Sequence, residues 1–302
     1  MTSERFEQPV STVLDEFTNL FLAEYPVHCE LRTGPLGRKA LHHHDGYEIY
    51  LCLRGTGSYI VEENLYPLHA GTLTIIAPHV LHHPFSKPGQ DFDRYVLSVS
   101  DSYLNRLDQS CPAMKEGIGS LLTGGVSGSH YFLPAPQFEQ ARLLLEELSA
   151  SLASTQPWRE LSMLRCMSEL ALLIIRKHEE PLAQREIISP DERLIGDVVA
   201  YLVAAYRDEL HIDDLLRKFP VSRSRLFRLF KETTGYSIKR FLNEYRLNKA
   251  KGLLAQTSLP MIDVAGQTGF GDLSHFFHQF RTSTGMTPMS YRRQAALGRT
   301  QG

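Results

Sequence analysis

Cysteines and long apolar runs are the features this chain has least of. Its 302 residues include four cysteines, Cys29, Cys52, Cys111 and Cys166, which stand far apart. Disulfide frameworks and zinc knuckles show recurring short cysteine spacings, so the sequence predicts neither, and we expect inert thiols. No segment approaches the roughly 18 consecutive apolar residues that a membrane span needs. The sequence therefore predicts a protein without a membrane partner.

The first twenty residues also lack the pattern of a secretory leader. A signal peptide has a basic start and an apolar run of about 7–15 residues. Residues 1–20 are instead polar, with acidic side chains at Glu4, Glu7, Asp15 and Glu16. We therefore expect a cytoplasmic protein, and its length and 42% hydrophobic content allow two domains, each with its own core.

Positive charge gathers in the second part of the chain. Residues 191–302 carry 17 Lys+Arg against 11 Asp+Glu, a net charge of +6, whereas residues 1–190 carry 15 against 23, a net charge of −8. Only the C-terminal part suits a polyanion, although each basic residue alone is equally compatible with an ordinary solvated helix face. The basic residues that we expect to contact phosphates are Arg223, Arg225, Arg228, Lys231, Lys239, Arg240, Arg246, Lys249, Lys251, Arg281, Arg292 and Arg293.

One pattern of residue types occurs twice in the sequence, fifty positions apart, in residues 212–237 and 262–287. Each copy predicts a helix, a tight turn and a second helix. In the second copy Asp272 is placed to cap a helix that carries Phe276 and Phe280 four positions apart on one face. This is the helix-turn-helix layout, which offers its second helix to a DNA major groove. Two tandem units, at about 211–232 and 261–283, predict two successive groove contacts with double-stranded DNA.

The residues expected to face the groove precede or alternate with the apolar positions of each second helix. Phe227 could meet a thymine methyl group, and Arg228 could pair with guanine. The full set of DNA-binding candidates is Arg223, Ser224, Phe227 and Arg228 in the first unit, and Leu273, Ser274, His275, Phe277 and His278 in the second.

A recurring set of residues stands out in the last hundred positions: Ile262, Ala265, Gly269, Phe270, Asp272, Ser274, Phe276, Phe280, Gly285, Thr287, Pro288, Tyr291 and Arg292. This set resembles the signature of the AraC family of bacterial transcription regulators, and residues 235–254 are similar to that family's first motif and linker helix. Two positions depart from the pattern: Pro220 stands where the first turn usually has Gly, and His278 where the second recognition helix often has Arg. The resemblance implies a regulator, expected to be an activator, that responds to a small-molecule effector and contacts RNA polymerase.

Short strands are predicted between residues 26 and 100. The segments 47–54, 58–61, 65–68, 72–76 and 94–99 are rich in Tyr, Ile, Leu and Val, and turn residues or the segment 78–88 separate them. Such spacing suggests a small barrel or sandwich. Within it, His42, His44 and Glu48 followed by Gly55 resemble the first cupin motif, and Gly71 followed by Pro78 and His82 resembles the second.

His42, His44, Glu48 and His82 match the residues that bind a divalent metal in cupins. Imidazoles and a carboxylate on neighbouring strands can hold such an ion and leave positions open for a ligand. Two alternatives remain open: a solvated start of a strand with one imidazole hydrogen-bonded inside the barrel, and a former metal site that now binds an organic effector. The effector-pocket candidates are His42, His44, Glu48, Tyr47, Tyr50, Tyr59, His82 and Tyr95, a set that would suit a sugar.

Two helices are expected after the barrel, at residues 137–153 and 158–178. Both carry broad apolar stripes, which must pack on the barrel or on another chain. Because DNA half-sites are usually read by paired proteins, we expect a homodimer through this region.

The overall expectation is an α+β multidomain chain that acts as a regulator and not as an enzyme. Residues 1–135 would form a cupin-like sensing barrel with an N-terminal arm, 136–180 a helical dimerisation segment, 181–189 a linker, and 190–302 the all-α DNA-binding domain. Ser189, Pro190 and Glu192 predict a capping box at the start of the last domain. Two alternative functions are a cupin metalloenzyme with accessory helices and a DNA-binding protein that needs no effector.

Overall fold

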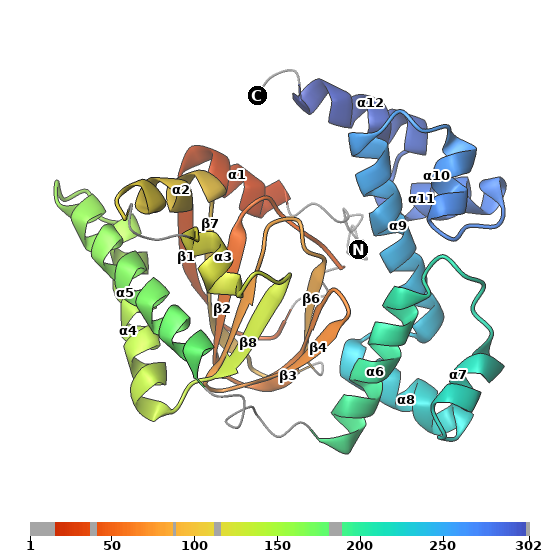
Figure 1. Cartoon of the computed structure of the whole chain (residues 1–302), viewed down its shortest axis with the longest axis horizontal. Helices are drawn as coiled ribbons and strands as arrows, with labels where there is room; N and C mark the ends of the chain where they lie inside the picture. The colour runs from red at the N-terminus through yellow and green to blue at the C-terminus, as the bar shows by residue number, and fades with distance from the viewer. Residues whose placement is uncertain (1–15, 37–40, 87–88, 112–115, 181–188, 300–302) are drawn as a thin grey trace, which may run out of the picture.

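The computed structural model describes residues 16–36, 41–86, 89–111, 116–180 and 189–299. These residues form a sheet-rich N-terminal half and an all-helical C-terminal half, which lie side by side (Figure 1). This arrangement confirms the expected α+β organisation. The expected N-terminal arm before residue 16 and nearly all of the expected linker at 181–189 lie outside the described residues.

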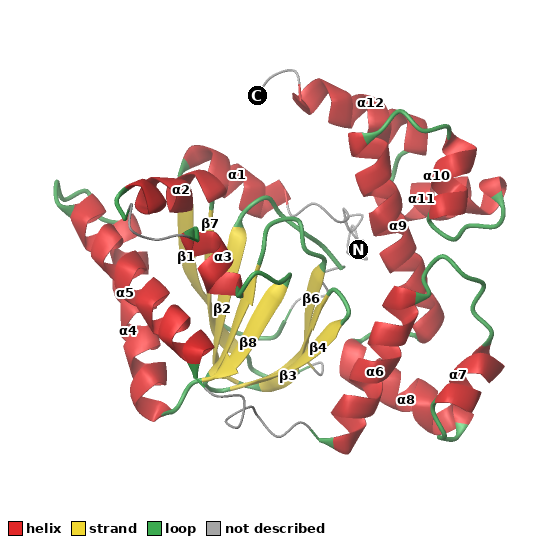
Figure 2. Ribbon diagram, in the orientation of Figure 1, coloured by secondary structure: helices red, strands yellow, loops and turns green. Residues whose placement is uncertain are grey.

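Two antiparallel sheets make up the barrel (Figure 2). One has the strand order β1-β7-β2-β5-β8 and the other β4-β3-β6, and a single β-bridge between His42 and His82 joins the segment before β2 to β6. The strands are β1 (Val27–Arg32), β2 (Tyr47–Arg54), β3 (Thr56–Val61), β4 (Asn64–His69), β5 (Thr72–Ile76), β6 (His82–Ser86), β7 (Asp93–Val99) and β8 (Gly128–Phe132).

The sequence predicted five of these strands and missed β1, β6 and β8. Strand β6 lies in the segment 78–88, which we expected to separate two strands. Pro84 is tolerated in β6 because this strand lies at an edge of its sheet, and Pro67 occupies the opposite edge in β4. Edge position thus explains how a proline-containing segment became a strand.

Strand β2 is buried on both of its faces. Ile49 and Leu51 belong to the core between the larger sheet and the helices, whereas Tyr50 and Cys52 belong to the core between the two sheets. The helices of this half are α1 (Glu16–Glu24), α2 (Asp101–Gln109), α3 (Ile118–Thr123), α4 (Ala135–Leu152) and α5 (Arg159–Glu179), of which α4 and α5 cover the two expected helical segments.

The C-terminal half begins at the predicted capping box. The Ser189 side chain accepts a hydrogen bond from the Glu192 backbone N–H, and the Ser189 N–H donates to the Glu192 carboxylate at 3.0 Å. The helices that follow are α6 (Pro190–Ala204), α7 (Ile212–Lys218), α8 (Arg223–Thr234), α9 (Ile238–Gln256), α10 (Met261–Gln267), α11 (Leu273–Thr284) and α12 (Pro288–Arg299). Among the described residues, no helix combines the length and the apolar content that crossing a membrane requires.

The two halves share one apolar core. Leu41, Ile60 and Leu81 of the barrel lie in the same buried cluster as apolar residues of α6, α8 and α9. Hydrogen bonds reinforce this contact: the Leu41 N–H donates to the Tyr236 hydroxyl at 3.1 Å, and the Ser58 hydroxyl donates to the Thr233 carbonyl. The barrel therefore holds the helical half through its core and not only through surface charges.

We expect the duplicated apolar positions to carry the stability of each helix-turn-helix unit. Phe276 is 0% exposed, so Phe276→Ala should lower the free energy of unfolding of the C-terminal half by about 3–5 kcal/mol. The exposed His278, two positions along α11, supplies the control, and His278→Ala should change that free energy by no more than about 0.5 kcal/mol. Urea unfolding followed by circular dichroism measures both values, and equal losses would contradict this assignment.

Candidate DNA interface and effector site

The first helix-turn-helix unit consists of α7 and α8. Ser222 begins α8 by accepting a hydrogen bond from the Arg225 N–H, and Leu226 and Phe230 anchor the helix in the core. The turn between α7 and α8 contains Pro220 and runs through the extended Phe219, and no residue from 219 to 222 has a positive φ. The first turn therefore uses a backbone path that needs no glycine.

The second unit consists of α10 and α11. The Asp272 carboxylate accepts from the His275 N–H at 2.6 Å, which caps α11, while Phe276 and Phe280 are fully buried. Gly269 adopts φ +82°, and a Cβ there would lie 2.5 Å from the Tyr206 carbonyl oxygen, so this turn requires glycine. The two units thus build the same helix pair with different turns.

The predicted DNA-binding residues lie on the exposed sides of the two second helices. Arg223, Ser224, Arg228, Leu273, Ser274, His275 and His278 are exposed, and Phe227 and Phe277 are half-buried. The Arg223 guanidinium lies 5.6 Å from the centre of the Phe227 ring, and Arg228 pairs with Glu232 at 3.0 Å. An exposed pair of this kind contributes little energy, so Arg228 can exchange Glu232 for another partner.

Four of the basic residues expected to contact phosphates make other contacts. Arg246 donates to the carbonyls of Tyr206 and Asp208, and Arg292 donates to the Leu259 carbonyl. Lys249 pairs with Glu62 of the barrel at 3.3 Å, and Lys251 is 1% exposed. Lys251 is too buried to contact a phosphate in this arrangement, because charge alone does not tell which face of a helix is buried. Phosphate contact by the other three, which are part-buried and have partners within the protein, stays a prediction.

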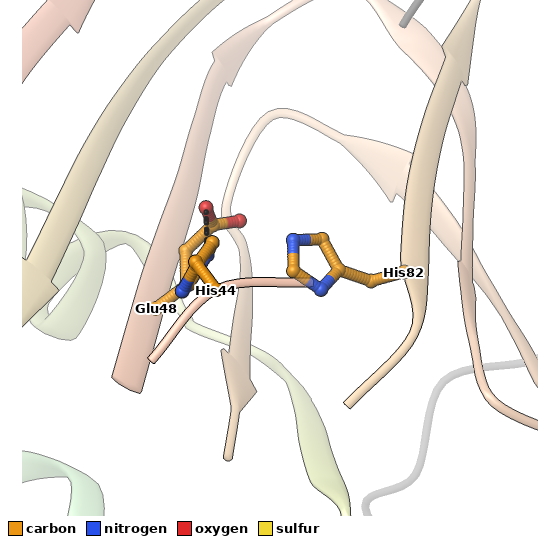
Figure 3. A group of neighbouring side chains, drawn as sticks. All are labelled: His44, Glu48 and His82. Atoms are coloured by element: carbon orange, nitrogen blue, oxygen red, sulfur yellow. Dashed lines mark hydrogen bonds and ion pairs between the residues drawn. The ribbon is translucent and has the colours of Figure 1, made fainter. Parts of the chain in front are cut away.

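In the barrel the structure brings together three of the four predicted metal ligands (Figure 3). His44 lies in the segment before β2, Glu48 is near the start of β2 and His82 begins β6, and one ligand atom from each lies within 4.8 Å of the others. All three side chains are buried. His42 stands beside this group, with its ring centre 4.3 Å from that of His82.

Hydrogen bonds orient both imidazoles toward the group. His44 Nδ1 lies 2.9 Å from the Gly46 carbonyl and His82 Nδ1 lies 2.8 Å from the Val80 carbonyl, so each Nδ1 carries the proton that it donates. His44 Nε2 then faces Glu48 at 3.2 Å, and His82 Nε2 has no hydrogen-bond partner within the described residues. In the neutral imidazoles two nitrogen lone pairs and a carboxylate converge, which a shared cation would satisfy.

The protonation states of these groups also suit a cation. Burial acts to raise the pKa of Glu48, but its close contacts with His44, His82 and Tyr59 outweigh burial and hold that pKa well below its usual value. Burial lowers the pKa of His82 to about 4. The Tyr59 hydroxyl donates to the second oxygen of Glu48 and fixes its direction. At neutral pH the group thus offers a carboxylate and a neutral imidazole, the forms that bind divalent metals.

The four tyrosines expected in the effector pocket lie in two different cores, one on each side of the larger sheet. Tyr50 and Tyr59 lie in the core between the two sheets, on the side of β2 that carries Glu48. Tyr47 and Tyr95 lie on the other face, in the core with α4 and α5. The structure therefore does not bring Tyr47 and Tyr95 to the histidines, because side chains alternate along a strand and Tyr47 directly precedes Glu48.

Comparison with known proteins connects both halves to one family. An AraC-like ligand-binding domain matches residues 29–170, and a helix-turn-helix domain matches residues 215–294. The chain belongs to the AraC family of transcription regulators. It is 26% identical over 260 residues to the HTH-type transcriptional activator RhaS of Enterobacter sp. (strain 638), covering 85% of this chain and 89% of RhaS, and 28% identical over 258 residues to RhaS of Klebsiella pneumoniae (83% and 86%). Among solved structures, the comparison finds ToxT of Vibrio cholerae, with 13% identity, a TM-score of 0.36, and coverage of 88% of this chain and 98% of ToxT.

Membership of the AraC family decides between the functions considered from the sequence. The protein is a DNA-binding transcription regulator controlled by an effector, and it is not an enzyme. The alternatives of a cupin metalloenzyme and of an effector-independent DNA-binding protein are set aside, because the relatives are regulators and the barrel matches a ligand-binding domain.

Sequence reasoning missed the residues that join the barrel of this AraC family protein to its helical half. Glu62 accepts from the Tyr245 hydroxyl at 3.0 Å and pairs with Lys249, and Tyr236 receives the Leu41 N–H. These partners stand more than 180 residues apart, and a single sequence contains no local signal for such a contact.

The site predicts stoichiometric binding of a divalent metal. Protein that is stripped with a chelator and dialysed against Zn²⁺, Mn²⁺, Ni²⁺ or Fe²⁺ should retain about one equivalent of at least one of them by elemental analysis. The double variant His44→Ala/Glu48→Ala removes two of three ligands and should lower the retained metal at least tenfold. His211→Ala, which removes an exposed imidazole of the helical half, should leave it unchanged. Retention below a tenth of an equivalent by the unaltered protein would exclude a metal site here.

Proposed function

We propose that the protein reads DNA with two matched helix faces, one on α8 and one on α11. The observation that carries this proposal is that the two faces are equivalent. On α8 the buried Leu226 and Phe230 leave Arg223, Phe227 and Arg228 on the outer side. On α11 the buried Phe276 and Phe280 leave Leu273, Phe277 and His278 at the corresponding positions. Exposed arginine and aromatic side chains at such positions can read base edges in a major groove.

Helix α9 supports a tandem reading of one side of the DNA. Its 19 residues, Ile238–Gln256, span about 28 Å at 1.5 Å per residue. Together with its flanking turns, this length approaches the ~34 Å between successive turns of the major groove. One protomer would then cover a half-site of two consecutive grooves without internal symmetry.

The barrel supplies the effector response. The proposed pocket includes His42, His44, Glu48, Tyr50, Tyr59 and His82, whose nitrogen and oxygen atoms suit a metal ion and the oxygen atoms of a small polar effector such as a sugar. Since the RhaS relatives are transcriptional activators, we propose that this protein activates transcription in the cytoplasm by recruiting RNA polymerase.

A homodimer is favoured by an unusual apolar face on α5. Trp158, Leu161, Leu164 and Leu172 are 59%, 69%, 41% and 50% exposed, and the three leucines follow one stripe of the helix. Exposed apolar side chains gathered on one side of a helix indicate an interaction surface, and the common solution for a DNA-binding protein is a twofold pair. This face is therefore the proposed contact between two protomers.

Base reading is tested by two variants with different expected patterns. Arg228→Ala should cost about 1–3 kcal/mol at the preferred base and relax specificity there. Lys239 is exposed at the start of α9 and outside the two reading faces, so Lys239→Ala should weaken all sequences by a similar and smaller amount. Selection of binding sites from random DNA measures both effects. An unchanged preferred motif with Arg228→Ala would show that this residue does not read a base.

The dimer contact is tested by sedimentation at micromolar concentration. Leu161→Lys/Leu164→Lys places two charges in the proposed contact and should convert dimers to monomers without loss of folding, because both side chains are exposed in the single chain. Ile262→Lys alters a 65% exposed apolar side chain in the helical half and should leave the dimer intact. A double variant that stays dimeric would place the contact elsewhere.

A further inference from the structure

The two helix-turn-helix units have separate apolar cores. The core of the first unit includes Phe241 and Tyr245 of α9, and the core of the second includes Leu247 and Ala250 of the same helix. Within the described residues the two cores share no side chain. Helix α9 runs from one unit to the other (Figure 1). Because a single connecting helix can bend, apolar packing alone does not set the angle between the units.

Arg246 lies on α9 at the junction of the two cores. It stands between Tyr245 of the first core and Leu247 of the second. Its Nε donates to the Tyr206 carbonyl at 2.6 Å, and its Nη2 donates to the Asp208 carbonyl at 2.6 Å. Both carbonyls belong to the segment that joins α6 to α7. The side chain therefore ties the middle of α9 to the entry of the first unit.

The turn of the second unit packs on the same atoms. A Cβ on Gly269 would lie 2.5 Å from the Tyr206 carbonyl oxygen, 2.8 Å from Arg246 Nε and 3.0 Å from the Arg207 Cα. The backbone of this turn thus lies against the hydrogen bond between Arg246 and Tyr206. Three segments that are distant in sequence meet at one point, and they belong to both units and to the helix between them.

The chemistry of arginine suits this junction. A guanidinium group is planar and presents its N–H donors in a fixed arrangement, so two of them can hold two carbonyls at set positions. A lysine ammonium carries the same charge as a single point on a flexible stem and lacks that geometry. Arg246 is half-buried, and two of its nitrogens are engaged inside the protein.

We propose that Arg246 fixes the distance and the rotation between the recognition helices α8 and α11. It would thereby set the number of base pairs that must separate the two DNA segments that these helices contact. The proposal rests on the tandem reading proposed above. Arg246 is then a positioning residue, which acts through the segment 206–208 and the turn at Gly269. A phosphate contact by Arg246 would instead add affinity without any effect on the preferred spacing.

The test measures binding of the full chain to the half-site selected from random DNA, with its native spacing or with one base pair inserted between the two contacted segments. The insertion moves the second segment by about 3.4 Å and rotates it by about a tenth of a turn. The unaltered protein should bind the inserted half-site at least tenfold more weakly than the native one. In Arg246→Lys and Arg246→Gln this ratio should fall below threefold, with weaker binding at the native spacing.

Two controls separate positioning from a phosphate contact and from a folding defect. Loss of one phosphate contact lowers the salt slope of binding by about one, whereas Arg246→Gln should leave the slope unchanged because both units still reach the DNA. Lys239→Gln removes an exposed charge of α9 and should weaken both half-sites by the same factor. DNA that contains only the segment contacted by α8 should be bound equally by the unaltered protein and by both Arg246 variants.

A ratio of threefold or more in both variants would overturn the role of Arg246, and a slope lowered by about one in Arg246→Gln would assign this residue to a phosphate. An unaltered protein whose own ratio is below threefold would overturn the tandem reading and this proposal with it. Should one variant not fold, the other decides, since neither replacement reproduces the two-point contact.

Discussion

The apolar core that runs from the barrel into the helical half is the constraint on which the other features depend. Leu41 and Leu81 of the barrel pack with Val199, Leu226 and Phe241 of the helices. Separating the halves would expose this surface to water, at about 25 cal/mol for each Å² of apolar area. The position of the first recognition helix is therefore tied to the barrel segments on either side of the His42–His82 bridge.

Those same two segments carry the barrel's polar site on their other side. His82 faces His44 and Glu48, while its neighbour His83 packs its ring against Tyr236, with ring centres 4.9 Å apart. Leu41 likewise contacts the helical half while His42 lies beside His82. Neighbouring side chains of an extended segment point to opposite sides, so a residue of the polar site and a residue of the contact with the helical half stand next to each other in each segment. A displacement of either segment at the polar site must therefore also displace its contact with the helical half. This is a physical route by which an effector could alter DNA binding.

Some features of the site could be predicted from local spacing and others could not. His44 and Glu48 are four residues apart, and His82 follows at a spacing that the cupin motif contains, so their convergence was foreseeable. Tyr47 and Tyr95 were assigned to the pocket by residue type alone, and the alternation of side chains places them on the other face. Lys249 and Lys251 were assigned to DNA by charge, whereas long-range packing directs one to Glu62 and buries the other.

The sequence by itself determined the duplicated helix-turn-helix units, the strands β2 and β5, the capping box at Ser189 and the family, because each depends on short-range periodicity or on a local motif. Tertiary structure decided the strand status of β6 despite Pro84, the inward or outward direction of each tyrosine, and the burial of Lys251. Those properties depend on which surfaces meet across the fold. A face becomes buried only when a partner from elsewhere in the chain packs against it, and the identity of that partner is not encoded in any local stretch of residues.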